Sequence, residues 1–139
     1  MPADATTINP ILRPTYTYYR RFEAASTDTL PFLRALDALL TLENYNGFTL
    51  QATPQAHRNA KRYLENASYV IHIPMPEFTP DGEGGIDIEW ENNGRHLALS
   101  CRARPDNPDF ISWREPQGRY DGRPANQALL NERLEWLLS

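Results

Sequence analysis

The chain has 139 residues, of which 40% are hydrophobic and 23% charged, and this composition is typical of one globular domain with a single core. Its formal charge of −4 is uneven, because residues 1–72 carry +1 and residues 73–139 carry −5. An acidic second half argues against wholesale nucleic-acid binding, which shows as a basic domain or face. The single cysteine, Cys101, excludes an internal disulfide and a multi-cysteine zinc site.

The start of the chain lacks both the charged segment and the apolar run of a signal peptide, and no apolar stretch is long enough to span a bilayer. We therefore expect a cytoplasmic protein that does not enter a membrane. Residues 1–25 are predicted to form an extended arm, because tyrosine and threonine favour extended chain while Pro10 and Pro14 oppose a helix. Residues 26–139 are expected to form a single domain.

Two helices are predicted after the arm. The first, about residues 29–42, has Pro31 in its first turn and leucines at helical spacing, which are Leu33, Leu36, Leu39 and Leu40. An Asn-Gly turn then interrupts the chain at residues 46–47. The second helix, about residues 54–67, begins at the capping pair Thr53-Pro54. Its apolar stripe is made of Ala56, Ala60, Tyr63, Leu64 and Ala67.

Alternation with a period of two predicts a β-hairpin in the middle of the chain, after an extended stretch at residues 68–78. Asn93-Gly94 suits a hairpin turn, which needs positive φ at both central positions. On the first strand we expect the apolar residues to face the helices, and these are Ile86, Ile88 and Trp90. The return strand repeats the pattern with Leu97, Leu99 and Cys101.

A further strand is predicted at "FISWRE", residues 110–115, and the chain should close with a turn and a helix at about 124–138. The apolar stripe of this last helix is expected to comprise Leu130, Leu134, Leu137 and Leu138. The order of elements predicts the α+β class, with two N-terminal helices, an antiparallel meander of three to four strands and a C-terminal helix. The helices should cover one face of the sheet.

Two stretches resemble motifs of a group of small bacterial proteins. "NYNGF", residues 44–48, is similar to the group's N-W-D-G-Y motif. Residues 76–100 are similar to its second motif, a proline-containing strand followed by D-G-G-hydrophobic-x-[IL]-E-W. Tyr45, Asn46 and Phe48 depart from the first motif. The group has no assigned activity, and its members resemble non-enzymatic partners encoded beside other small genes, some in mobile or defence-type neighbourhoods. For this chain we expect a bacterial defence, CRISPR-associated or toxin–antitoxin-type operon. The resemblance implies a partner protein and supplies no catalytic residue.

The acidic residues of the hairpin are the first candidate site. Asp87, Glu89 and Glu91 should lie about 6.5–7 Å apart along one strand face, so their carboxylates diverge, whereas magnesium or calcium needs converging oxygens. We interpret them first as a solvent-facing row and second as an acidic face that binds a partner. The remaining alternative is a metal-dependent hydrolase or nuclease, which would use Asp81, Glu83, Asp87 and Glu89.

The arm supplies the second candidate site, because "RPTYTYYRRF", residues 13–22, is rich in the residue types of interface hot spots. The residues that we assign to partner binding there are Arg13, Tyr16, Tyr18, Tyr19, Arg20 and Arg21. One alternative is that the arm packs back on the domain or forms an edge strand. Another is a nucleic-acid accessory role, in which bases stack on the tyrosines beside the arginines.

No catalytic set, cofactor site or metal site is recognised in the sequence. The three histidines share no ligand-like spacing, and Cys101 has the phase of a core residue. We therefore expect a non-enzymatic accessory protein that docks on another protein, encoded nearby.

Overall fold

The computed structural model describes residues 31–139. Helix α1 (Pro31–Ala38) continues as the 3-10 turn η2 (Leu39–Thr41), and helix α2 (Pro54–Ser68) follows. Five strands come next, β1 (Glu77–Pro80), β2 (Ile86–Asn92), β3 (Arg95–Cys101), β4 (Phe110–Arg114) and β5 (Tyr120–Pro124), before helix α3 (Gln127–Leu138). The predicted arm and its assigned residues lie outside the described part of the chain.

Helix α2 begins where the local sequence signals predicted it. The side chain of Thr53 accepts a hydrogen bond from the backbone N–H of Ala56 at 3.1 Å, and Pro54 occupies the first helical position, where its missing N–H costs nothing. The predicted stripe of α2 is buried along its whole length. The turn before it has positive φ at Asn46 and Gly47, as the Asn-Gly pair predicts.

The sheet is an antiparallel meander in the order β1-β2-β3-β4-β5, which confirms the α+β class. The expected number of strands was too low. Strand β5 pairs with β4 from Tyr120 to Pro124, in a stretch where we predicted a turn. Most of its residues are exposed, so neither face of this edge strand buries apolar side chains and the sequence shows no period-two alternation.

Two further expectations need correction. The extended stretch predicted at residues 68–78 begins later, because Ser68 still belongs to α2 and residues 69–70 form a turn, and its last two residues, Glu77 and Phe78, join β1. The last helix begins later than predicted, at Gln127, where the side chain of Asn126 caps it by accepting a hydrogen bond from the N–H of Leu129 at 2.8 Å. Leu138 is exposed and does not belong to the buried stripe.

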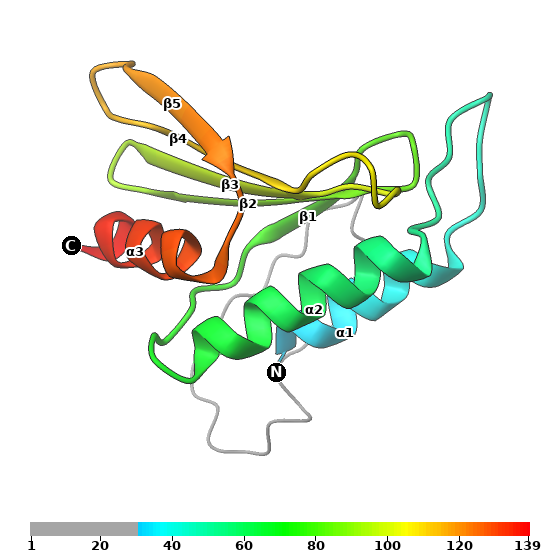
Figure 1. Cartoon of the computed structure of the whole chain (residues 1–139), viewed down its shortest axis with the longest axis horizontal. Helices are drawn as coiled ribbons and strands as arrows, with labels where there is room; N and C mark the ends of the chain where they lie inside the picture. The colour runs from blue at the N-terminus through cyan, green and yellow to red at the C-terminus, as the bar shows by residue number, and fades with distance from the viewer. Residues whose placement is uncertain (1–30) are drawn as a thin grey trace.

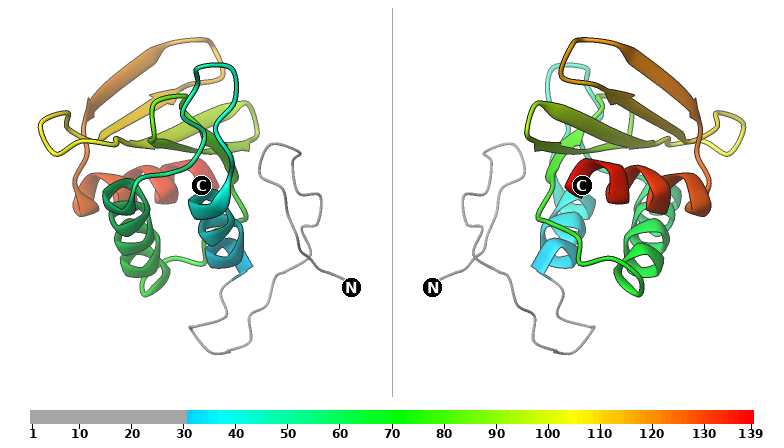
Figure 2. Two further views of the ribbon diagram at one scale, coloured as in Figure 1. Left: turned by 90° about the vertical axis from the view of Figure 1, so that its right-hand side faces the viewer. Right: turned by 90° about the vertical axis from the view of Figure 1, so that its left-hand side faces the viewer.

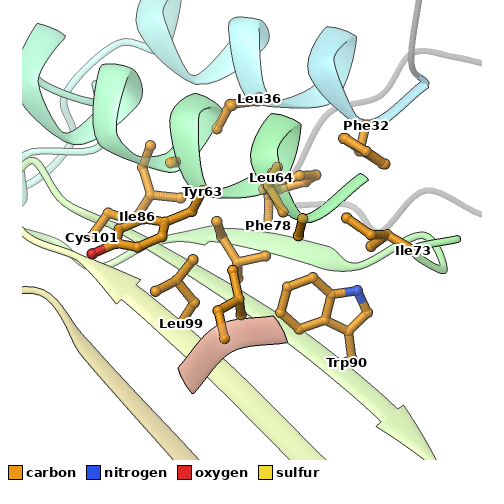
Figure 3. Close-up of a cluster of buried hydrophobic side chains, with 14 of the residues drawn as sticks. Phe32, Leu36, Tyr63, Leu64, Ile73, Phe78, Ile86, Trp90, Leu99 and Cys101 are labelled. Atoms are coloured by element: carbon orange, nitrogen blue, oxygen red, sulfur yellow. The ribbon is translucent and has the colours of Figure 1, made fainter. Parts of the chain in front are cut away.

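The molecule has two layers, with α1, α2 and α3 on the same side of the sheet (Figures 1 and 2). Figure 3 shows the core between the layers, where side chains from α1 and α2 point toward those of the strands. The alternation in β2 sets this arrangement, because Ile86 and Ile88 are fully buried and Trp90 is 3% exposed. The indole N–H of Trp90 donates to the carbonyl of Pro74 at 2.9 Å, so its one polar atom is satisfied in the core.

Trp90→Ala should lower the free energy of unfolding by about 3–5 kcal/mol, because it opens a large cavity between the layers. Glu89→Ala, one residue away on the opposite face, should change it by about 0.5 kcal/mol or less. Chemical denaturation of both variants measures the difference. A Glu89→Ala variant that unfolds while Trp90→Ala stays folded would contradict this assignment of faces.

Candidate partner-binding surfaces

The face of the sheet opposite the helices, here called the open face, carries the acidic row of β2. The register places Asp87 opposite Ser100, Glu89 opposite Ala98, and Glu91 opposite His96. Directly paired residues of antiparallel strands share a face, so the open face continues across the later strands. There it is formed by Phe110, Ser112, Arg114, Tyr120, Gly122 and Pro124. On the other side of β2, the edge strand β1 places Glu77 and Thr79 on the same face. The acids therefore lie on the β1–β2 side of a surface that is mostly neutral elsewhere.

Two of these acids have weak partners on the neighbouring strands. An oxygen of Glu89 lies 3.5 Å from Nε2 of His96, and an oxygen of Glu91 lies 3.9 Å from the guanidinium of Arg114. Contacts this long between partly exposed side chains contribute about 0–1 kcal/mol, and the one with His96 is an ion pair only when the imidazole is protonated. An incoming cation can therefore displace either partner at little cost, and the row keeps its capacity to bind a basic group.

Asp87, at the start of this row, is half-buried. Burial raises the pKa of its carboxyl group, and the negative charges of Asp81 and Glu89 add to this effect. A hydrogen bond from Ser100 and the charge of Arg102 act in the opposite direction, without cancelling the rise in pKa. Folding therefore favours the neutral form of Asp87, and its charged form is held on the open face at a cost in stability.

The four acids of the metal-dependent alternative do not act as one group. Asp81 is committed to its own turn, because its Oδ1 accepts from the backbone N–H groups of Glu83 at 2.7 Å and Gly85 at 2.8 Å. Glu83 is exposed in that turn, whereas Asp87 and Glu89 lie on the strand that follows. Across residues 31–139, no group of three or more His, Cys, Asp or Glu side chains is placed to hold a metal ion.

Cys101 lies in the core, as its phase predicted. Burial raises the pKa of its thiol far above the usual range, and the charge of Asp109 raises it further. The thiol therefore stays protonated at neutral pH and lacks the reactivity of a thiolate. The side chain of His57 already has a partner within the chain. Its Nε2 lies 2.7 Å from a carboxylate oxygen of Asp37, and this contact links α2 to α1.

A second exposed surface, here called the aromatic hairpin, comprises residues 44–50 and projects beyond the helices (Figure 1). Tyr45 and Phe48 pair through two backbone hydrogen bonds of 3.1 and 2.8 Å, with Asn46 and Gly47 forming the turn between them. Tyr45 is 65% exposed and Phe48 59% exposed. We did not assign these residues to a site from the sequence, although two aromatics flanking an Asn-Gly turn were a signal for one.

The base of the aromatic hairpin is bonded to the glycine loop, defined as residues 81–85. The N–H of Thr49 donates to the carbonyl of Gly82 at 2.9 Å, and its carbonyl accepts from the N–H of Gly84 at 3.2 Å. The N–H of Thr53 donates to the carbonyl of Gly84 at 2.9 Å. These bonds connect the chain that directly follows residues 44–48 to the glycine loop, which lies within residues 76–100.

The fold and these two surfaces define a class: an α+β protein in which, across residues 31–139, the helices lie on one face of an antiparallel sheet and no helix lies on the other. Comparisons with protein-family models, curated proteins and solved structures find no match to this chain. The resemblance of residues 44–48 and 76–100 to a bacterial group therefore stays a prediction. Within residues 31–139, no helix combines the length and apolar character needed to cross a bilayer.

Gly84→Ala should destabilise the protein more than Gly118→Ala. Both glycines have φ above +90°, but an added Cβ at Gly84 would lie 3.1 Å from a methyl carbon of Thr53 and 3.2 Å from Ala103, whereas Gly118 faces open space. Gly118→Ala should cost about 1–2 kcal/mol for the backbone alone. Gly84→Ala should cost about 1–3 kcal/mol more through crowding, as measured by urea denaturation. Equal losses would show that the glycine loop tolerates displacement.

Asp87→Asn should stabilise the protein at pH 7, because the amide keeps an acceptor for Ser100 and removes a half-buried charge. Because folding raises the pKa of Asp87, protonation of this carboxyl group adds to the free energy of unfolding. This contribution is complete below the unfolded pKa of 3.8 and is lost as the pH rises through the folded pKa. The advantage of Asp87→Asn should therefore disappear toward pH 4, as thermal melts at both pH values would record.

Glu91→Gln is the matched control, because it removes an exposed charge from the same strand face and should change stability by about 0.5 kcal/mol or less. A stabilisation by Asp87→Asn that is independent of pH would contradict the electrostatic explanation.

Proposed function

We propose that this chain is a non-enzymatic, cytoplasmic binding module that docks on a basic partner protein through the open face of its sheet. The observation that carries the proposal is the acidic row of β2. Three carboxylates, those of Asp87, Glu89 and Glu91, lie on one strand face that no described helix covers.

The chemistry of the row favours arginine and lysine side chains on the partner. Each carboxylate accepts hydrogen bonds and presents two oxygens, which match the guanidinium fork of arginine. The pairs that Glu89 and Glu91 make within the chain are long and exposed, so exchanging them for a partner's cation costs little. A cation beside Asp87 would also offset the cost of holding its charge in a half-buried position.

The rest of the open face supplies less polar contacts beside the acidic row of β2. The ring of Phe110 lies over Gly122, because a Cβ there would come within 2.5 Å of the ring. Tyr120 is exposed next to Arg114 on the adjoining strand. Aromatic and arginine side chains next to a polar rim are the composition of protein–protein interfaces. The proposal does not depend on the arm, whose assigned residues lie outside the described part of the chain.

The test is affinity purification of the full chain from its native host at native expression level. We expect a basic protein, encoded near this gene, to co-purify with the wild type and to be lost with Glu89→Lys/Glu91→Lys. With the purified pair, the charge reversal should weaken binding by at least about tenfold, because like charges then face each other. Raising the salt concentration should also weaken the wild-type complex.

Glu132→Lys/Glu135→Lys is the matched control, since it makes the same change in net charge at exposed positions of α3, on the helical side. It should leave the affinity unchanged. Recovery of the chain alone, or equal losses in the two double variants, would refute docking through the open face.

A further inference from the structure

We infer that the aromatic hairpin is a second contact with this partner, inserting Tyr45 and Phe48 together into an apolar pocket with a basic rim. The inference rests on the proposed function, because the pocket belongs to the partner protein. Tyr45 and Phe48 are directly paired across the hairpin, so their side chains lie on the same face of it. The two rings therefore form one apolar knob.

The knob is held in place before any partner arrives. A two-residue turn with positive φ at Asn46 and Gly47 has the twist that suits a hairpin. Oδ1 of Asn44 accepts from the N–H of Leu50 at 3.0 Å and of Gln51 at 3.2 Å, closing the base from within. Aromatic side chains have few rotatable bonds, so presenting them on a fixed backbone lowers the entropy lost on binding.

The fold itself does not require aromatic residues at these positions. The core takes Leu39 before the hairpin and Ala52 after it, and the N–H of Ala52 donates to the carbonyl of Leu39 at 2.9 Å, which closes the loop below the knob. Phe48 touches the chain near Gly82, where an added Cβ would lie 3.4 Å from its ring. Most of both rings is left in water, an unfavourable exposure that binding in a pocket would remove.

Charge around the knob defines the rim of the pocket. Residues 43–50 and 81–85 together contain three acidic residues and no basic one. Arg102 and Arg104 flank Ala103, which lies against Gly84 of the glycine loop, and Arg104 is paired with Asp106 at 3.6 Å. The carboxylate of Asp81 is used by its own turn, while Glu43 and Glu83 are exposed and available to a partner's cations. The glycine loop leads directly into β2, so the acidic residues around the knob lie next to the acidic row of the open face. One basic partner can therefore engage both surfaces.

The experiment places a photo-crosslinking amino acid at position 45 or 48 of the full chain in the native host. Position 69 is the control, because Tyr69 is 76% exposed at the other end of α2. We expect the same basic protein to be crosslinked from positions 45 and 48 and not from 69. Crosslinking to a second copy of the chain, to lipid, or to no molecule would overturn the inference.

Affinity measurements on the purified pair complete the test. Tyr45→Ala/Phe48→Ala should weaken binding by at least about thirtyfold, as expected for buried aromatic anchors, with an unchanged melting temperature. Tyr69→Ala/Val70→Ala, which removes two exposed apolar side chains elsewhere, should change the affinity less than about twofold. Tyr45→Phe/Phe48→Tyr keeps both rings and should retain most of the affinity.

The two proposals fail in distinguishable ways. If Glu89→Lys/Glu91→Lys abolishes binding while Tyr45→Ala/Phe48→Ala does not, the proposed function stands and the role of the aromatic hairpin is refuted. If neither double variant changes the affinity of the pair, both proposals are refuted.

Discussion

The alternation of side chains along β2 is the constraint on which the rest of the structure depends. Successive residues of a strand point to opposite faces, so burying Ile86, Ile88 and Trp90 beneath the helices forces the intervening acids onto the open face. Shifting the register by one residue would place three carboxylates in the core, at a cost of several kcal/mol for each ion. One strand thus determines both where the helices pack and where the negative charge lies.

The glycine loop connects this strand to the aromatic hairpin. Its backbone bonds to Thr49 and Thr53 fix the hairpin relative to the start of β2, although about thirty residues separate them in the chain. Asp81 holds the loop by accepting hydrogen bonds from two backbone N–H groups, so one of the five acidic residues between positions 81 and 91 has a structural role. The structure therefore divides a single acidic stretch into a turn former and a strand face, which have different chemistry.

Most of the architecture could be predicted where a periodic pattern coincided with burial. The stripe of α2, the capping by Thr53 and the two faces of the β2–β3 hairpin follow from spacing alone, because a buried face imposes its period on the residues. Strand β5 could not be predicted in this way, since hydrogen bonds to β4 define it and most of its residues are exposed. The turn of the aromatic hairpin could be predicted from its Asn-Gly pair, but the exposure of its two aromatic rings could not.

The sequence by itself determined the elements whose apolar residues repeat, the turns that need positive φ, and the face of β2 that remains polar. Each of these depends on residues close together in the chain. The tertiary structure alone decided which acids share a surface, that Asp87 is half-buried, and that residues 44–50 rest on residues 81–85. These properties depend on contacts between distant segments, and backbone hydrogen bonds form such contacts without leaving a pattern in the side chains.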